Sequence, residues 1–180
     1  MLTKWGYEVA EALQPIAGER EFEEFTAGRY SADTRVPSLL EAASEAVRNF
    51  CGWHVAPSVE CTCTLTAEGA VADLPLRDVT AVSSVEEDGQ PVEFDWRRCG
   101  MVRKRGGSFS GSWDGVTVRC TAGTEADPAL KRAVCAIAEN MLTVSQTAAQ
   151  ESAGNVSVTY RGETLSERDR MALEPYRLVM

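Results

Sequence analysis

The sequence of 180 residues contains few of the side chains on which catalysis and metal binding usually depend. It has one histidine, and none of its six cysteines forms a Cys-x-x-Cys pair. The chain also lacks an apolar run of the roughly 18 residues that a membrane span requires. Its first residues, MLTKWGYEVAEAL, lack the continuous apolar stretch of a signal peptide. We therefore expect a protein that stays in the cytoplasm in which it is made, without a cofactor or a metal ion and without membrane contact.

Basic side chains are scarce, because 18 Lys and Arg stand against 27 Asp and Glu, a formal net charge of −9. Proteins that grip nucleic acid neutralise phosphates with Lys and Arg, so this balance disfavours DNA binding through overall charge. It is compatible with a surface past which DNA slides, because an acidic wall repels a polyanion. One dense group of cations, here called the basic cluster, comprises Arg97, Arg98, Arg103, Lys104 and Arg105. It is either a solvated hairpin end or a patch that meets an acidic partner or the DNA backbone.

Hydrophobic residues make up 44% of the chain, an ordinary proportion for a globular protein. Two stretches have the hydrophobic spacing of amphipathic helices. In the first, over 38–51, Leu39, Ala43, Val47 and Phe50 share a face, and Gly52 follows where a C-terminal cap is expected. Ser38 and Glu41 have the spacing of a capping box at its start. The second opens at Asp127 and Pro128, and its apolar face comprises Leu130, Val134, Ile137, Met141 and Val144.

Short strands are predicted between the two helices. Residues 55–65 alternate with the period of two that indicates a half-buried strand. Further strands are expected over 70–74, 79–85, 92–96, 101–103 and 116–122, with a hairpin turn at Asp88-Gly89. The predicted fold is α+β, with two packed long helices, a small antiparallel sheet inserted between them in sequence, and an extended C-terminal strand–helix tail.

The expected organisation has three parts. Residues 1–36 form a helical segment and a linker, with a short helix suggested by Trp5, Val9 and Ile16. Residues 37–145 form a core of helix, β-region and helix. Residues 146–180 form a C-terminal arm, in which a polar loop over 146–155 precedes a strand over 156–160. A terminal helix follows, with Ser166 and Asp169 at capping spacing.

Two groups of residues could carry chemistry. Cys51 and His54 could form a nucleophile and base of a hydrolase, but no triad motif surrounds them, and a local structural role for His54 is favoured. Cys61 and Cys63 could suggest a metal site, but they fall on the apolar face of a predicted strand, where core packing is expected. No catalytic residue is predicted.

The stretch GRYSADTRVPSLLEAASEAVRNFCGWHVAP resembles the head-to-tail connector (adaptor) family of tailed bacteriophages. The segments DLPLRDVTAVSSVEEDGQPVEFDW, GMVRKRGGSF, VTVRCTAGTEADPALKRAVCAIAENML and SVTYRGETLSERDRMALEPYRLVM continue the resemblance over about residues 27–180. The family motif at the end of the first helix is matched here by Arg48, Phe50, Cys51, Gly52, Trp53, His54, Val55 and Pro57.

The resemblance implies a structural protein of the virion rather than an enzyme. Such proteins form a ring beneath the portal protein, commonly of twelve copies. The ring extends the channel for double-stranded DNA, without sequence-specific binding, and links the capsid to a stopper or tail-completion protein. The alternative is that the chain is itself a stopper or tail-completion protein of the neck. Candidate contacts to the portal or a neighbouring copy are Leu173, Pro175, Tyr176, Arg177 and Leu178, since Tyr and Arg are common at interface hot spots.

Overall fold

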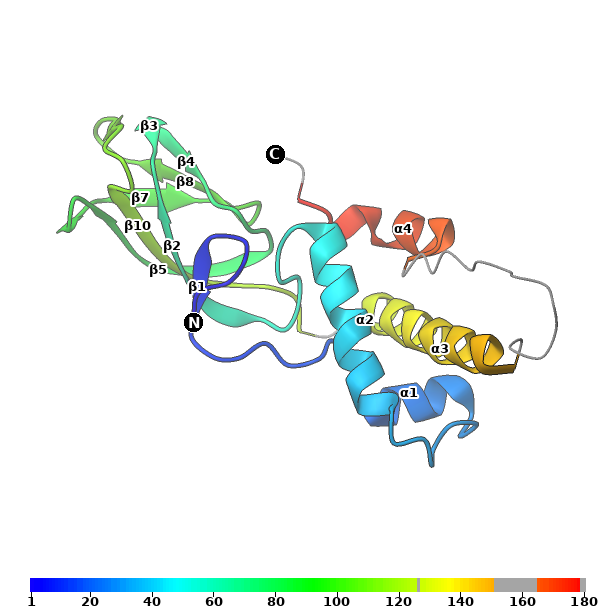
Figure 1. Cartoon of the computed structure of the whole chain (residues 1–180). Helices are drawn as coiled ribbons and strands as arrows, with labels where there is room; N and C mark the ends of the chain where they lie inside the picture. Colours follow the sequence, from blue (N-terminus) through cyan, green and yellow to red (C-terminus); the bar gives the residue numbers. More distant parts are fainter. Residues whose placement is uncertain (126, 151–164, 179–180) are drawn as a thin grey trace. The chain divides into compact units, whose positions relative to one another are not determined.

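The computed structural model describes residues 1–125, 127–150 and 165–178 (Figure 1). The chain divides into two compact units. The first, here the β unit, comprises Met1–Leu13, Gly52–Glu125 and Leu178–Met180, and the second, here the helical unit, comprises Gln14–Cys51 and Ala126–Arg177. Antiparallel sheets in one unit and helices in the other confirm the predicted α+β class. Each unit is assembled from separate stretches of chain, whereas the three predicted segments were continuous.

A five-stranded antiparallel sheet, in the order β1-β2-β10-β5-β6, is the main layer of the β unit. A three-stranded sheet, β4-β8-β7, and a two-stranded sheet, β3-β9, complete it. The strand bounds are β1 Tyr7–Val9, β2 Val59–Leu65, β3 Glu68–Gly69, β4 Val71–Asp73, β5 Val79–Glu87, β6 Gln90–Pro91, β7 Phe94–Trp96, β8 Met101–Lys104, β9 Phe109–Ser110 and β10 Val116–Ala122.

Strand β10 lies at the centre of the main sheet because its side chains alternate strictly between core and surface. Val116, Val118, Cys120 and Ala122 are buried, whereas the residues between them are more exposed. Between β5 and β6, Asp88 and Gly89 both have positive φ, 48° and 77°. A two-residue turn of this kind matches the twist of the flanking strands, so the predicted hairpin is confirmed.

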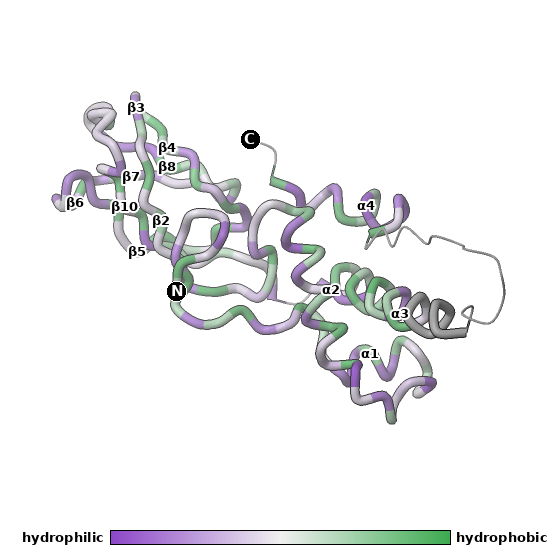
Figure 2. The backbone as a smooth tube through the Cα atoms, in the orientation of Figure 1, coloured by the Kyte–Doolittle hydropathy of each residue, from purple (hydrophilic) through white to green (hydrophobic). Residues whose placement is uncertain are grey.

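The helical unit contains α1 Glu19–Thr26, α2 Val36–Cys51, α3 Pro128–Gln150, α4 Glu167–Leu173 and the short 3₁₀-helix η1 Glu174–Tyr176. Helices α2 and α3 pack against each other, and α1 and α4 pack onto this pair. Hydrophobic and hydrophilic residues alternate along α2 and the coloured part of α3 in Figure 2, as an amphipathic helix requires. Ala43 and Val47 lie on the buried face of α2, and Leu130, Val134 and Ile137 on that of α3. No helix of the described residues is long and apolar enough to cross a membrane.

The helix caps show where local prediction succeeded. The Asp127 carboxylate accepts hydrogen bonds from the backbone N–H groups of Ala129 and Leu130 at the start of α3. Ser166 and Asp169 form the predicted capping box of α4. The box expected at Ser38 is wrong. Helix α2 begins two residues earlier, at Val36, and Pro37 lies in its first turn, where the helix needs no hydrogen bond from the missing N–H. The Ser38 hydroxyl donates to the Arg35 carbonyl instead of capping the helix.

Three further predictions need correction. Residues 1–16 form no helix, because Tyr7 and Val9 alternate with Glu8 and join the sheet as β1, paired with β2. Strand β2 begins at Val59 rather than 55, because Val55 has a φ of 58°, which is outside the extended conformation of a strand. Helix α3 continues to Gln150, through the start of the predicted polar loop. The rest of that loop and the strand expected over 156–160 lie outside the described residues.

Candidate functional site

The Gly-Trp-His motif forms a buried hub in the β unit. The side chains of Trp53 and His54 are 1% and 0% exposed, and their rings meet edge-on with centroids 5.2 Å apart. His54 Nε2 lies 3.0 Å from the carbonyl oxygen of Ala122 at the end of β10. Because a carbonyl only accepts, Nε2 carries a hydrogen, and Nδ1 is hydrogen-bonded to the hydroxyl of Tyr7 at 2.8 Å. The motif therefore ties β1 to the end of β10.

Gly123 completes the hub because no larger residue fits there. Its φ is 110°, and a Cβ atom at this position would lie 2.5 Å from the Pro57 carbonyl oxygen and 2.9 Å from His54 Nε2. The next residue, Thr124, donates a backbone hydrogen bond of 2.8 Å to the Val55 carbonyl. The end of β10 therefore lies directly against the 54–57 segment.

The Cys51 and His54 side chains are poorly suited to nucleophilic chemistry. Cys51 is fully buried in the helical unit, and burial raises the pKa of its thiol to about 12, so that the reactive thiolate is scarce near neutral pH. Both ring nitrogens of His54 are hydrogen-bonded within the β unit. These observations favour the local structural role of His54 over the hydrolase interpretation.

The core packing predicted for Cys61 and Cys63 is confirmed, since both are buried free thiols. Cys120 and Cys135 are likewise buried and free of disulfide bonds. Cys61 lies opposite Cys120 and Cys63 opposite Val118 in the sheet. Cys99 differs, because it is exposed in the turn between β7 and β8.

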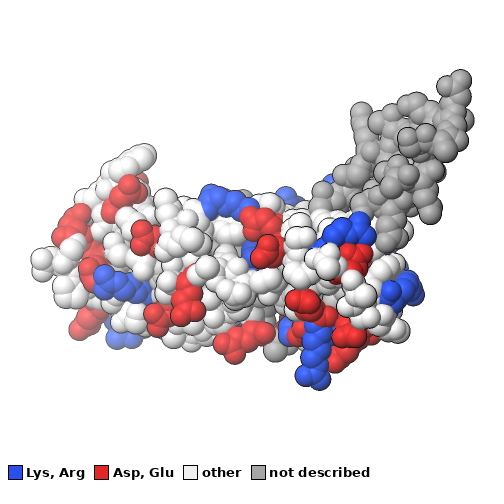
Figure 3. All heavy atoms as spheres, turned by 60° about the horizontal axis from the view of Figure 1, so that its bottom comes forward, with Lys and Arg blue, Asp and Glu red and all other residues white. Residues whose placement is uncertain are grey.

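Three members of the basic cluster are paired with carboxylates of the same unit. Arg98 pairs with Asp78, Lys104 with Glu87, and Arg105 with Asp95. These hydrogen bonds hold the pKa values of the Glu87 and Asp95 carboxyl groups below their usual range. On the face drawn in Figure 3, blue and red side chains are likewise interspersed. Most of the cluster is therefore neutralised locally.

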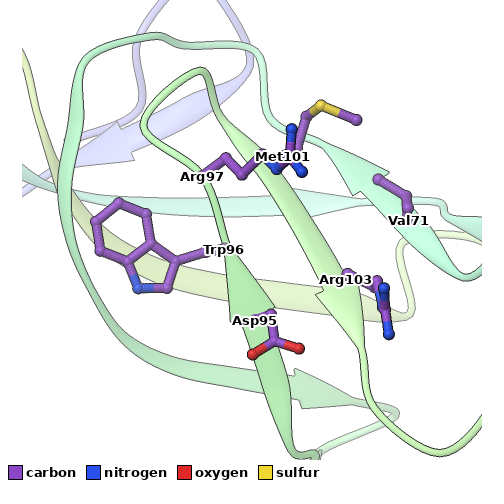
Figure 4. Close-up of a pocket in the computed structure, with 6 residues that line it drawn as sticks. All are labelled: Val71, Asp95, Trp96, Arg97, Met101 and Arg103. Carbon is purple, nitrogen blue, oxygen red and sulfur yellow. The ribbon is translucent and has the colours of Figure 1, made fainter.

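The other two members, Arg97 and Arg103, line a pocket. It has a volume of about 440 Å³ and is formed by Val71 of β4, Asp95 and Trp96 of β7, Arg97, and Met101 and Arg103 of β8 (Figure 4). Arg103 lies opposite both Val71 and Asp95 in the sheet register, so it is central to this surface. Trp96 and Met101 remain 37% and 39% exposed. The pocket therefore combines apolar surface with two guanidinium groups.

The C-terminal candidates fall into two groups. Leu173 is fully buried in the helical unit, where α4 packs on α2 and α3, and cannot be an exposed anchor. Pro175 and Arg177 are exposed, whereas Tyr176 and Leu178 are partly exposed.

Two side-chain contacts hold this end of the chain in the helical unit. The Tyr176 hydroxyl donates to the carboxylate of Asp127, and the Arg177 guanidinium lies over the ring of Phe50, 5.6 Å from its centroid. Because Asp127 also caps α3, the start of α3 and the C-terminal segment share one carboxylate. The 49-residue separation of Tyr176 and Asp127 left no local signal for this contact.

Sequence reasoning missed Trp113 altogether. Its side chain is 87% exposed in the loop between β9 and β10. The loop reads GSWDG, and the glycines on either side of a lone aromatic residue could have indicated an exposed tip.

No family model and no curated protein matches the chain. Solved structures do. The chain matches the neck of an empty gene transfer agent (GTA) particle, computed with C6 symmetry, at 18% identity and a TM-score of 0.62. It also matches the neck of a native GTA particle, computed with C12 symmetry, at 18% identity and a TM-score of 0.60. A third match is the virion of a native GTA particle, at 20% identity and a TM-score of 0.62.

Each match covers 97% of this chain and 96% of the other. The likeness therefore includes both units and reaches most of residues 1–26, which the sequence resemblance did not cover. The chain shares the fold of the GTA neck structures, which is in keeping with the resemblance to connector proteins in its sequence.

Proposed function

We propose that the chain is a structural neck protein of a phage-type particle, a head-to-tail connector of the adaptor kind. Copies form a ring beneath the portal, extend the DNA channel, and join the capsid to the stopper or tail. The observation that carries the proposal is the match over 97% of the chain to structures of a particle neck. Because the match spans nearly the whole of both chains, it is not the reuse of one small motif.

A ring is the assembly that fits best. The matched neck structures were computed with C6 and C12 symmetry, which supports a cyclic arrangement and is compatible with twelve copies. A subunit of such a ring must offer two unlike surfaces that meet head to tail. The protein then acts in the neck of the virion, and it is present in the host cytoplasm during assembly.

The charge distribution suits a channel that DNA must traverse. The chain carries a net charge of −9, and three of the five cations of the basic cluster are paired with carboxylates. A surface of this kind offers few free cations to phosphates, so DNA passes with little retention. The role is structural rather than enzymatic, since Cys51 is buried and His54 is fully engaged in the hub.

Native mass spectrometry of the chain with the portal ring of the same particle tests the proposal. Addition of a complete set of copies to the portal supports an adaptor. Failure to bind the portal, together with binding to a preformed adaptor ring, would show a stopper or tail-completion protein instead. Pro175→Ala and Arg177→Ala test the exposed C-terminal candidates without disturbing buried Leu173, and loss of portal binding is expected for at least one of them.

A further inference from the structure

Trp113 is a large aromatic side chain held out into solvent at the tip of the β unit. It is 87% exposed, more than any other large hydrophobic residue of the described part of the chain. A tryptophan buries on the order of 150–250 Å² when it packs, and tryptophan is enriched among interface hot spots. An exposed indole in this position can therefore bury a large apolar surface against a partner.

The loop that carries Trp113 is held in place on both sides. The Asp114 N–H donates to Thr66 Oγ1 at 2.9 Å, and the Asp88 N–H donates to the Gly115 carbonyl at 2.8 Å. The Gly111 N–H donates to the Ala67 carbonyl at 3.0 Å. A side chain presented by a fixed loop loses little conformational freedom on binding, so the tip is preorganised for contact.

The pocket of Figure 4 has the size to receive such a side chain. Its volume of about 440 Å³ exceeds that of an indole, and Val71 and Met101 supply apolar surface beside Asp95, whereas the Trp96 ring points to the other side of β7. Arg97 and Arg103 form no ion pair with any described residue, although Arg103 is close enough to contribute to the lowered pKa of Asp95. The pocket therefore carries cations that are available to a partner.

The loop carries the opposite charge. Asp114 directly follows Trp113 and is exposed, and Asp88, bonded to the same loop, is also exposed. Neither carboxylate forms an ion pair with a described residue. Asp95 of the pocket is already paired with Arg105, so the acidic tip and the two arginines of the pocket are complementary in charge, and Val71 and Met101 offer apolar surface to the indole. The tip and the pocket are different surfaces of one unit.

We propose that Trp113 of one copy inserts into the pocket of the next copy, with Asp114 facing Arg97 and Arg103. A contact between two different surfaces of the same chain is heterologous, and its repetition closes a ring when the rotation allows. This inference rests on the proposed function, because it names the surfaces through which neighbouring copies of the ring meet.

Cysteine cross-linking between two separately purified proteins tests the contact. Both carry Cys99→Ser, which removes the exposed native thiol. One carries Ser112→Cys beside the intact Trp113, and the other carries Val71→Cys in the pocket. The effective concentration of one subunit next to its neighbour in a ring is in the millimolar range. The two proteins are therefore mixed at about 1 mM under oxidising conditions, so that a weak contact is populated. We expect a disulfide-linked dimer in the mixture and none in either protein alone.

Matched variants then identify the groups responsible. Trp113→Ala in the Ser112→Cys protein should lower the cross-linking yield about tenfold or more. Asp114→Asn, which keeps a residue tolerant of the positive φ of 52° found there, and Arg97→Ala should each lower it several-fold. Arg98→Ala is the control for Arg97→Ala, because Arg98 already pairs with Asp78, and it should leave the yield unchanged.

Equal yield with Trp113→Ala, or no cross-link in any mixture, would overturn the contact. The same cysteine variants are also added to the portal ring. If they bind there as a complete set of copies but do not cross-link, the proposed contact is wrong and the proposed function stands. If the parent chain itself fails to bind any neck component, it is the proposed function that fails.

Discussion

The hydroxyl oxygen of Tyr7 lies 2.8 Å from Nδ1 of His54 and 3.0 Å from its backbone nitrogen, so one side chain of β1 satisfies two polar groups of a residue 47 positions away. Both residues are almost completely buried. Strand β1 pairs with β2 and is three residues long, so this side-chain contact is a further attachment of β1 within the β unit.

Tyr7→Phe should destabilise the protein by about 2–3 kcal/mol, because it removes the two buried hydrogen bonds between the Tyr7 hydroxyl and Nδ1 and the N–H of His54. The free energy of unfolding, from denaturation followed by tryptophan fluorescence, measures the loss. Tyr30→Phe is the control, since it removes a hydroxyl from a partly exposed ring, and it should change stability by less than about 0.5 kcal/mol. A Tyr7→Phe protein as stable as the parent would show that the hub does not hold β1.

Gly123→Ala should prevent correct packing of the hub, because the added Cβ atom would overlap the Pro57 carbonyl and the φ of 110° is unfavourable for alanine. We expect a loss of more than about 2 kcal/mol. Gly107→Ala is the matched comparison, since its Cβ atom would meet nothing within 4 Å and its backbone needs no positive φ. Equal melting temperatures of the two variants would contradict the assigned role of Gly123.

Local patterns in the sequence predicted the regular elements well, and the exceptions are instructive. The Asp127 and Ser166 caps and the Asp88-Gly89 turn were correct because each depends on neighbours within three residues. Strand β1 was mistaken for a helix because its stability comes from pairing with β2, more than 50 residues away. Such pairing overrides local propensity and leaves no local trace.

The candidate site was less predictable for the same reason. The Cys-Gly-Trp-His motif was identified, but its partners Tyr7 and Ala122 are brought to it only by the fold. The basic cluster looked uniform in sequence, yet its members differ in the structure. Arg98 is paired with Asp78, which lies 20 residues before it, whereas Arg97 faces the pocket.

Tyr176→Phe should loosen the C-terminal segment by removing the hydrogen bond to Asp127. That bond lowers the pKa of the Asp127 carboxyl below the ordinary value of 3.8. The hydrogen bond therefore stabilises the folded protein fully above pH 3.8, and this contribution is lost as the pH falls through the lowered pKa of the folded state. We expect a loss of about 1–2 kcal/mol at pH 7 and a smaller difference from the parent at pH 3. A difference that grows on acidification would contradict this linkage.

The cysteines should differ sharply in reactivity. Burial raises the pKa of Cys51 and Cys61 to about 12 and that of Cys135 to about 11, whereas Cys99 is exposed. At pH 8 a thiol reagent should modify only Cys99 rapidly in the folded protein, and all six thiols after unfolding. Cys99→Ser should remove the rapid reaction; a second fast thiol in that variant would show that the packing is wrong.

The same shifts predict an alkaline loss of stability. A buried thiol with a raised pKa stabilises the folded state fully below the ordinary value of 9.0 and loses this contribution as the pH rises through the folded value. The melting temperature should therefore decline between pH 9 and pH 11. An unchanged melting temperature over this range would indicate that the thiols are not buried.

Cryo-electron microscopy of the complete particle encoded by the same genome tests the central claim most directly. The account predicts a ring of copies of this fold in the neck, against the portal, with the DNA channel passing through it. Absence of the chain from the neck of an otherwise complete, tailed particle would contradict the account.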